Sequence, residues 1–119
     1  VALTGTLTDS GSNFGFLVID FPTNGIQNGA PDGMALIDST GECIELLSYE
    51  GRLSPESGPC SEFLAIDIGV AEITTTSGGS TAIGSSLQRV GTGSAGPDFE
   101  WSGPSANTKG LTNTGQVLQ

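Results

Sequence analysis

Histidine is absent from this 119-residue chain, and its absence removes most of the side-chain arrangements that enzymes use. Without histidine, neither a Ser-His-Asp triad nor a Cys-His pair can form, and no GxSxG elbow occurs. With two cysteines and no CxxC, a zinc site has too few ligands. Two of the thirteen acids could still form a catalytic carboxylate pair of the kind that glycosidases use, but their spacing along the sequence does not indicate which two. We therefore expect no enzyme activity.

Basic residues are also scarce. Only Arg52, Arg89 and Lys109 oppose the thirteen acids, and the formal net charge is −10. Nucleic acid and anionic membranes would be repelled by such a surface. No apolar run approaches the roughly 18 residues that a membrane span needs, so we expect no membrane insertion. The acids solvate outward strand faces or, alternatively, attract divalent cations or basic partners.

The two cysteines, Cys43 and Cys60, allow two interpretations, a mutual disulfide or two buried free thiols. A disulfide closing a loop of this size would stabilise the fold by about 3 kcal/mol and would indicate an oxidising compartment. We expect the disulfide, and with it an extracellular or cell-surface location. The chain does not begin with Met and shows no signal peptide. Residue 1 is therefore expected to mark a processing site or an artificial boundary.

Glycine, in contrast, is abundant, and the 19 glycines lie with Ser and Thr between short apolar runs. This composition is typical of many short strands joined by tight turns. Disorder is the alternative for an acidic, glycine-rich chain, but apolar residues make up 35% and cluster in blocks, which favours a packed core. No window of 11 or more residues shows helical spacing. The length fits one domain over residues 1–119.

The pattern predicts an all-β, antiparallel sandwich of about seven short strands with no significant helix. The middle of 13–21 is apolar on both faces, which predicts a central strand, and 34–38 with 43–49 predict a hairpin. Glu45 sits among apolar neighbours, and we expect it at a sheet edge. Loops are predicted at 23–33, 51–61 and 74–84, and the region after Pro104 is expected to be irregular. The seven predicted strands are 1–7, 13–21, 34–38, 43–49, 63–72, 85–90 and 98–102.

Calcium is the one cofactor that the acids make worth weighing, because hard cations prefer several oxygen ligands. The EF-hand pattern is absent, and acids in turns usually accept hydrogen bonds from their own backbone instead. We expect no cofactor, with calcium as the alternative and no assigned metal ligands. The candidate oxygens lie in predicted loops and turns, on Asp9, Asn13, Asp32, Asp38 and Glu42.

Two further motifs have weak functional interpretations. Gly91 to Gly96 matches GxGxxG, but Pro97-Asp98 and a strand follow where a dinucleotide site needs a helix, so we interpret it as a turn. Phe99 and Trp101 lie two apart on one face of a predicted strand. They are expected to be core aromatics, and an exposed platform for carbohydrate is the alternative.

Six short pieces together resemble the bacterial branch of the lamin-tail domain family, over residues 34–116. The pieces are Met34-Ala-Leu-Ile-Asp38, Leu47-Ser-Tyr-Glu-Gly51, Asp67-Ile-Gly-Val70, Ser86-Leu-Gln-Arg89, Asp98-Phe-Glu-Trp101 and Asn113-Thr-Gly-Gln116. The resemblance implies an immunoglobulin-like sandwich of secreted or surface proteins, without catalytic residues. It implies that Arg89 pairs with a nearby acid and that the framework consists of Leu47, Tyr49, Leu87, Phe99 and Trp101.

The chain departs from that family at its beginning, because family members usually start with further strands. Lys109-Gly110 also replaces a more usual Pro-Gly. A sandwich without its first strands would expose backbone edges and apolar surface. It could close with a new topology, accept a companion fragment, or accept a strand from another copy. We expect self-assembly, with Val1, Leu3 and Leu7 at the assembly edge.

Two functions therefore remain. The first is a non-catalytic structural module of an extracellular fibre, sheath or surface layer that assembles by β-strand pairing or donation. The alternative is an accessory ligand- or surface-binding module cut from a larger secreted nuclease, hydrolase or cell-surface protein.

Overall fold

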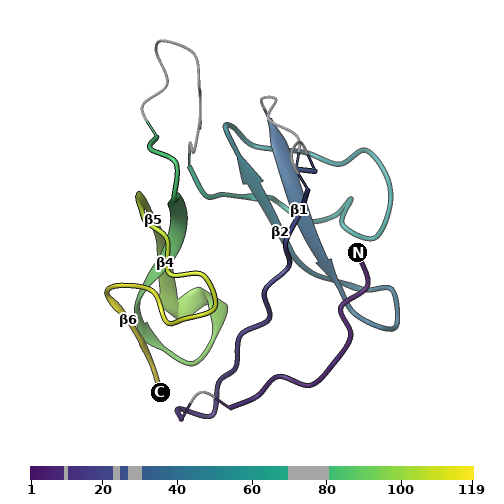
Figure 1. Ribbon diagram of the computed structural model, residues 1–119. Helices are drawn as coiled ribbons and strands as arrows, with labels where there is room; N and C mark the ends of the chain where they lie inside the picture. The colour runs from purple at the N-terminus through teal and green to yellow at the C-terminus, as the bar shows by residue number, and fades with distance from the viewer. Residues whose placement is uncertain (10, 23–24, 27–30, 70–80) are drawn as a thin grey trace.

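The protein is organised as two small β-sheets with essentially no helix (Figure 1). The computed structural model describes residues 1–9, 11–22, 25–26, 31–69 and 81–119. Within these residues the chain forms six strands and one short 3-10 turn, η1 (Gly96–Asp98). The first sheet has the order β1-β2-β3 and the second has the order β5-β4-β6. An all-β fold is therefore confirmed.

The first sheet is built on a hairpin between β1 (Asp32–Ile37) and β2 (Cys43–Tyr49). The strands are antiparallel, with Met34 opposite Leu47, and a bulge follows Leu36. The Asp38 side chain shapes the connecting turn by accepting hydrogen bonds from the backbone N–H groups of Thr40 and Glu42. The two-residue strand β3 (Ile66–Asp67) pairs with β2 in parallel. This places β2 in the middle of the sheet.

The buried core lies against one face of this hairpin. It consists of Cys43, Leu46, Cys60 and Ala65, with Leu53 packed beside them. Cys43 and Cys60 form a disulfide with a Cα–Cα distance of 5.2 Å, which ties β2 to the loop that follows it. The predicted disulfide is confirmed. Since only five apolar residues, these four and Ile68, are buried among the described residues, the crosslink supplements a very small core.

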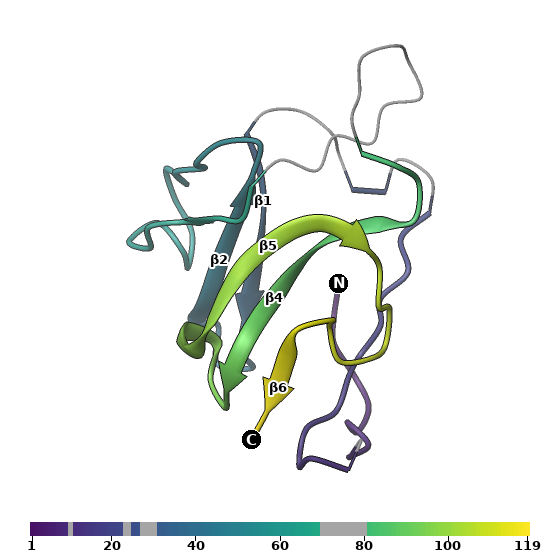
Figure 2. The same ribbon diagram turned by 90° about the vertical axis from the view of Figure 1, so that its left-hand side faces the viewer.

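The second sheet is formed by the last third of the chain (Figure 2). Its long central strand β4 (Ser85–Gly93) pairs antiparallel with β5 (Phe99–Ala106) and places Arg89 opposite Trp101. The short strand β6 (Gln116–Leu118) pairs in parallel with the end of β4. Residues 107–115 cross from β5 to the opposite edge of the sheet, where β6 begins.

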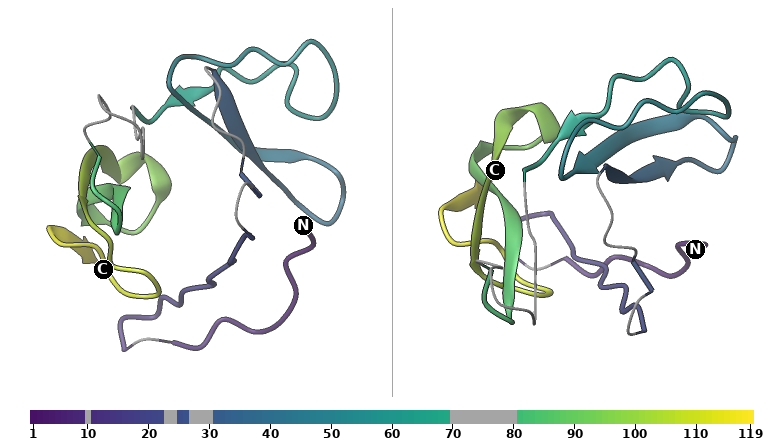
Figure 3. Two further views of the ribbon diagram at one scale, coloured as in Figure 1. Left: turned by 45° about the horizontal axis from the view of Figure 1, so that its top comes forward. Right: turned by 90° about the horizontal axis from the view of Figure 1, so that it is seen from above.

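Five of the seven predicted strands overlap observed ones, and the remaining two are wrong. Residues 1–7 and 13–21 form no strand. In Figure 3 they are the two arms of a wide loop that lies apart from the first sheet. Their alternating or apolar sequences suit strands, but a strand exists only where a partner strand completes its hydrogen bonds. Neither arm has a partner strand in the part of the chain that the structure describes.

Four other expectations need correction. The sheets are not purely antiparallel, because β2–β3 and β4–β6 are parallel pairs. Glu45 lies on the central strand of its sheet and not at an edge. The predicted strand 63–72 is reduced to Ile66–Asp67, with Val70 to Glu72 outside the described residues. The strand β6 falls in a region expected to be irregular, and most of the predicted loops 23–33 and 74–84 lies outside the description.

Removing the disulfide should destabilise the fold by about 3 kcal/mol, because the crosslink closes a loop between cysteines 17 positions apart. We expect this loss in urea unfolding of a Cys43→Ser/Cys60→Ser variant, followed by the fluorescence of the single tryptophan. Dithiothreitol should lower the stability of the wild type to a similar extent and leave the double variant unchanged. Equal stability of wild type and variant would contradict this role.

Candidate functional site

An ion pair between Arg89 of β4 and Glu45 of β2 joins the two sheets. Both side chains are largely buried, with 23% and 25% of their surfaces exposed. The guanidinium also lies over the indole of Trp101, 5.1 Å from the ring centroid. This is a cation–π geometry, and it is possible because the register of β4 and β5 places Arg89 opposite Trp101. The expected pairing of Arg89 with a nearby acid is thereby found.

The surroundings of Arg89 fix its position from several directions. Its backbone carbonyl accepts a hydrogen bond of 3.0 Å from Nδ2 of Asn113. Asn113 in turn accepts one of 2.6 Å from the Thr108 hydroxyl. On the other side, Gly96 leaves room for the guanidinium, since a Cβ at that position would lie 3.2 Å from Nη1 of Arg89. The turn between β4 and β5 therefore helps to hold the arginine toward the first sheet.

An apolar cleft surrounds this ion pair. Its volume is about 430 Å³, and its walls come from both sheets and from the segment before β3. Apart from the buried Leu46, the apolar residues that the first sheet and this segment contribute are each 41–71% exposed, so the space between the sheets is only partly filled. These residues are Leu36, Ile44, Phe63, Leu64 and Ile66. In a closed sandwich such inward positions would be core.

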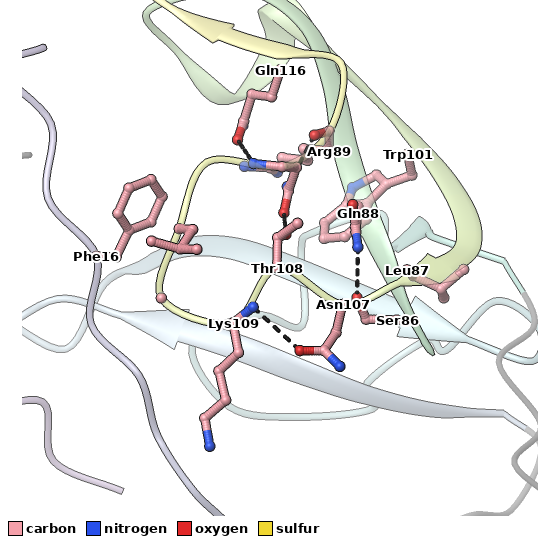
Figure 4. A pocket seen from close by; sticks show the side chains of 13 residues that line it. Phe16, Ser86, Leu87, Gln88, Arg89, Trp101, Asn107, Thr108, Lys109 and Gln116 are labelled. Carbon is pink, nitrogen blue, oxygen red and sulfur yellow. Dashed lines mark hydrogen bonds between the residues drawn. The ribbon is translucent and has the colours of Figure 1, made fainter. Parts of the chain in front are cut away.

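A second cavity, of about 370 Å³, lies on the second sheet beneath the 107–111 loop (Figure 4). Gln88 is buried in its floor and donates hydrogen bonds to the Ser86 hydroxyl and to the carbonyl of Ala106. Phe16, from the N-terminal part of the chain, closes one side and points toward the loop in Figure 4. This cavity is thus the place where an N-terminal arm reaches the second sheet.

The two N-terminal arms, 1–7 and 13–21, present apolar side chains to solvent, and in the second arm these side chains lie in the segment 15–21. Val1 is 90% exposed, and Leu3 and Leu7 are at least half exposed. Leu17, Val18, Ile19 and Phe21 are each 40–49% exposed. Among the described residues, no backbone hydrogen bond joins 15–21 to another segment. An exposed apolar stretch with free backbone groups is the chemistry of a strand without a neighbour.

The candidate calcium ligands do not converge. One carboxylate oxygen of Asp9 accepts hydrogen bonds from the backbone of Gly11, Ser12 and Asn13. Asp38 is used in the same way in its own turn, and the Thr40 hydroxyl and Glu42 N–H, which donate to its carboxylate, hold its pKa below the usual value. Glu42 lies in that turn, while Asp32 begins β1. Within the described ranges, no three His, Cys, Asp or Glu side chains are grouped to hold a metal ion.

The GxGxxG stretch forms the end of β4 and the turn into β5, as interpreted from the sequence. A carboxylate oxygen of Asp98 accepts 2.9 Å hydrogen bonds from the backbone N–H groups of Ser94 and Ala95. These bonds lower the pKa of Asp98. The turn is followed by a strand, so no helix N-terminus faces the glycines.

The expected framework residues Leu47, Tyr49, Leu87, Phe99 and Trp101 are all of intermediate burial, in strands β2, β4 and β5. The contact of Asp20 with Lys109 and the position of Phe16 were missed at the sequence level. Asp20 and Lys109 are 89 positions apart, and Phe16 is similarly distant in sequence from the 107–111 loop. No local sequence pattern indicates contacts between residues so far apart.

No protein-family model, curated protein or solved structure matches this chain. The lamin-tail resemblance therefore stays a prediction. In the part of the chain that the structure describes, no helix has the length and apolar character to cross a membrane.

The Arg89–Glu45 pair and the Trp101 stacking should be energetically coupled. We expect Arg89→Lys to lower the free energy of unfolding by about 1 kcal/mol, because lysine keeps the charge but loses the planar guanidinium. Glu45→Gln should cost a similar amount. The double variant should cost less than the sum, with a coupling of about 1 kcal/mol in a double-mutant cycle. Strict additivity would mean that the two side chains do not stabilise each other.

Asp98 should make the turn after β4 sensitive to acid. A carboxylate with a lowered native pKa stabilises the fold above its ordinary pKa of 3.8 and loses that contribution as the pH falls through the lowered value. The stability difference between wild type and Asp98→Asn should therefore shrink as the pH falls below about 4. Urea unfolding from pH 7 to pH 3 measures it. Glu100→Gln, which removes an exposed carboxylate of the adjacent strand β5, is the control for the loss of one negative charge. A narrowing of the same size in both variants would contradict this role of the turn.

Proposed function

We propose that this protein is a non-catalytic extracellular structural module that assembles with copies of itself through its N-terminal arms. The observation that carries the proposal is the apolar surface that the described residues leave exposed. Only five apolar residues among them are buried. The two arms, in contrast, hold seven large apolar side chains that are each 40–90% exposed, which is typical of a surface that contacts a partner. These seven are Val1, Leu3, Leu7, Leu17, Val18, Ile19 and Phe21.

The chemistry of the exposed surface supports the same proposal. The segment 15–21 alone presents Leu17, Val18, Ile19 and Phe21 to solvent. Contiguous apolar surface of this kind is rare on monomeric proteins and is typical of interaction sites. The free backbone groups of the arm favour β-strand addition, in which main-chain hydrogen bonds supply affinity and alternate side chains supply specificity.

A further strand, added to one of the two sheets by a neighbouring copy, would extend that sheet toward an immunoglobulin-like sandwich. That finer assignment, and the lamin-tail relationship, belong to the proposal. The disulfide supports an oxidising, extracellular setting.

The net charge of −10 sets the condition under which assembly would occur. Copies of the chain repel one another at long range, while the apolar arms attract only at contact. Salt screens the repulsion over a Debye length of about 8 Å at physiological ionic strength and leaves apolar contacts intact. Assembly should therefore increase with salt, which is opposite to the behaviour of complexes held by charge.

An accessory binding module is the second candidate, and the apolar cleft of about 430 Å³ favours it. A cleft of this size, with apolar walls and one ion pair at its base, can accept an apolar side chain or small ligand. A module of this kind would be a stable monomer that binds something other than itself. The oligomeric state therefore separates the two candidates.

Light scattering coupled to size-exclusion chromatography, at roughly 10–100 μM protein and with increasing NaCl, should show self-association that grows with concentration and salt. The double variant Leu17→Ser/Ile19→Ser should weaken association by roughly tenfold or more, because it removes two apolar side chains from the arm. Ile83→Ser is the matched control. This side chain is 85% exposed but lies outside the arms, and its loss should leave association unchanged. A monomer at all conditions would refute the assembly function.

A further inference from the structure

We infer that residues 15–21 are the exchanged element of this assembly, and that each copy places this segment on the second sheet of its neighbour, beside β6. The inference rests on the proposed function and names the donor, the acceptor and the contacts between them. It commits to a second copy of this chain as the occupant of the surface beneath the 107–111 loop. Each copy then gives one segment and receives one, which propagates an open chain of copies.

The acceptor surface is identified by what the segment already touches. Asp20 forms an ion pair with Lys109. Val18 lies against Gly110, where an added Cβ would be 3.3 Å from Cγ2 of Val18. Phe16 lines the cavity of about 370 Å³ together with Trp101 and Leu111. Alternate residues 16, 18 and 20 thus face one surface, which is the spacing of a strand lying on a sheet.

These contacts use side chains only. Among the described residues, the backbone of 15–21 makes no hydrogen bond to the second sheet, although the segment passes the 107–115 loop (Figure 2). The strand β6 is an edge of that sheet, and its Val117 is exposed. A strand placed there would pair with a free edge and would cover apolar side chains. Within one copy, side-chain contacts therefore place 15–21 on this surface, but no backbone hydrogen bonds pair the segment with the second sheet.

The connection between 15–21 and β1 explains why the segment of a neighbouring copy fits this surface better than the segment of the same copy. The segment continues through residues 23–31 into β1, which belongs to the first sheet. Within one copy the chain must therefore pass from one sheet to the other, and no backbone hydrogen bond joins the described residues of 15–21 to the β6 edge. A connection of nine residues reaches at most about 30 Å, enough to lead into an adjacent copy. Exchange keeps every side-chain contact and allows the backbone to pair.

Charge reversal at the Asp20–Lys109 contact separates contacts within a copy from contacts between copies. Each single variant, Asp20→Lys or Lys109→Asp, has like charges at positions 20 and 109. We expect each variant protein to self-associate roughly fivefold more weakly than the wild type at low salt. In a one-to-one mixture of the two variants, positions 20 and 109 carry opposite charges in every contact between unlike copies. Within each copy they carry like charges. The mixture should therefore recover wild-type association.

A matched control removes the effect of net charge. Asp20→Lys and Lys109→Asp change the net charge from −10 to −8 and −12. Glu56→Lys and Arg52→Asp change it by the same amounts in an exposed loop of the first half of the chain. Their mixture should show no recovery beyond that of either variant alone. Circular dichroism of each variant confirms that the fold is intact, which is expected because the Asp20–Lys109 pair is exposed.

Hydrogen exchange supplies the second readout. Amides of 15–21 should become at least roughly tenfold more protected in the associated wild type than in dilute monomer, because backbone pairing is the gain that exchange provides. Association of the wild type without recovery in the mixture of the Asp20→Lys and Lys109→Asp variants would overturn the exchange and leave self-assembly standing. Recovery without protection of 15–21 would overturn the pairing beside β6. A wild type that stays monomeric would overturn both the exchange and the proposed function.

Discussion

The ion pair between Arg89 and Glu45 joins two sheets that otherwise face each other across a partly filled apolar cleft. Each partner is largely buried, so neither charge can lose the other without being left in a poorly solvated place. Trp101 and Gly96 then hold the guanidinium in the orientation that reaches Glu45. Few of the described apolar residues are buried between the sheets, so this contact is a main link between them.

A fold with so small a core divides its stabilising interactions unevenly. The first sheet has the disulfide and the buried cluster around Leu46, while the second sheet relies on strand pairing and on polar contacts such as that of Asn113 with Arg89. The N-terminal arms contribute little to either sheet in a single copy. Their apolar residues are exposed in a single copy, and the proposed assembly rests on this exposure.

The sequence predicted well those features that depend on neighbouring residues. The hairpin of β1 and β2 followed from two apolar runs around a turn, and β4 and β5 followed from short runs around glycines and a proline. The disulfide followed because two cysteines have one possible partner each. The prediction of strands in the two N-terminal arms was wrong. Their local pattern suits strands, but a strand forms only when it pairs with the edge of a sheet that is remote in the sequence. The same reason hid β6, whose partner lies over twenty residues earlier, and the contact of Asp20 with Lys109.

The disulfide would have a mechanical consequence in the proposed assembly. When a protein is pulled by its ends, force passes along the shortest covalent path, and the Cys43–Cys60 bond takes the residues between them out of that path. Roughly 50 Å of extended chain is thereby withheld from stretching. A strained copy would lengthen only through its other segments, and the buried cluster around Cys43 would keep its connectivity under loads that separate the two sheets.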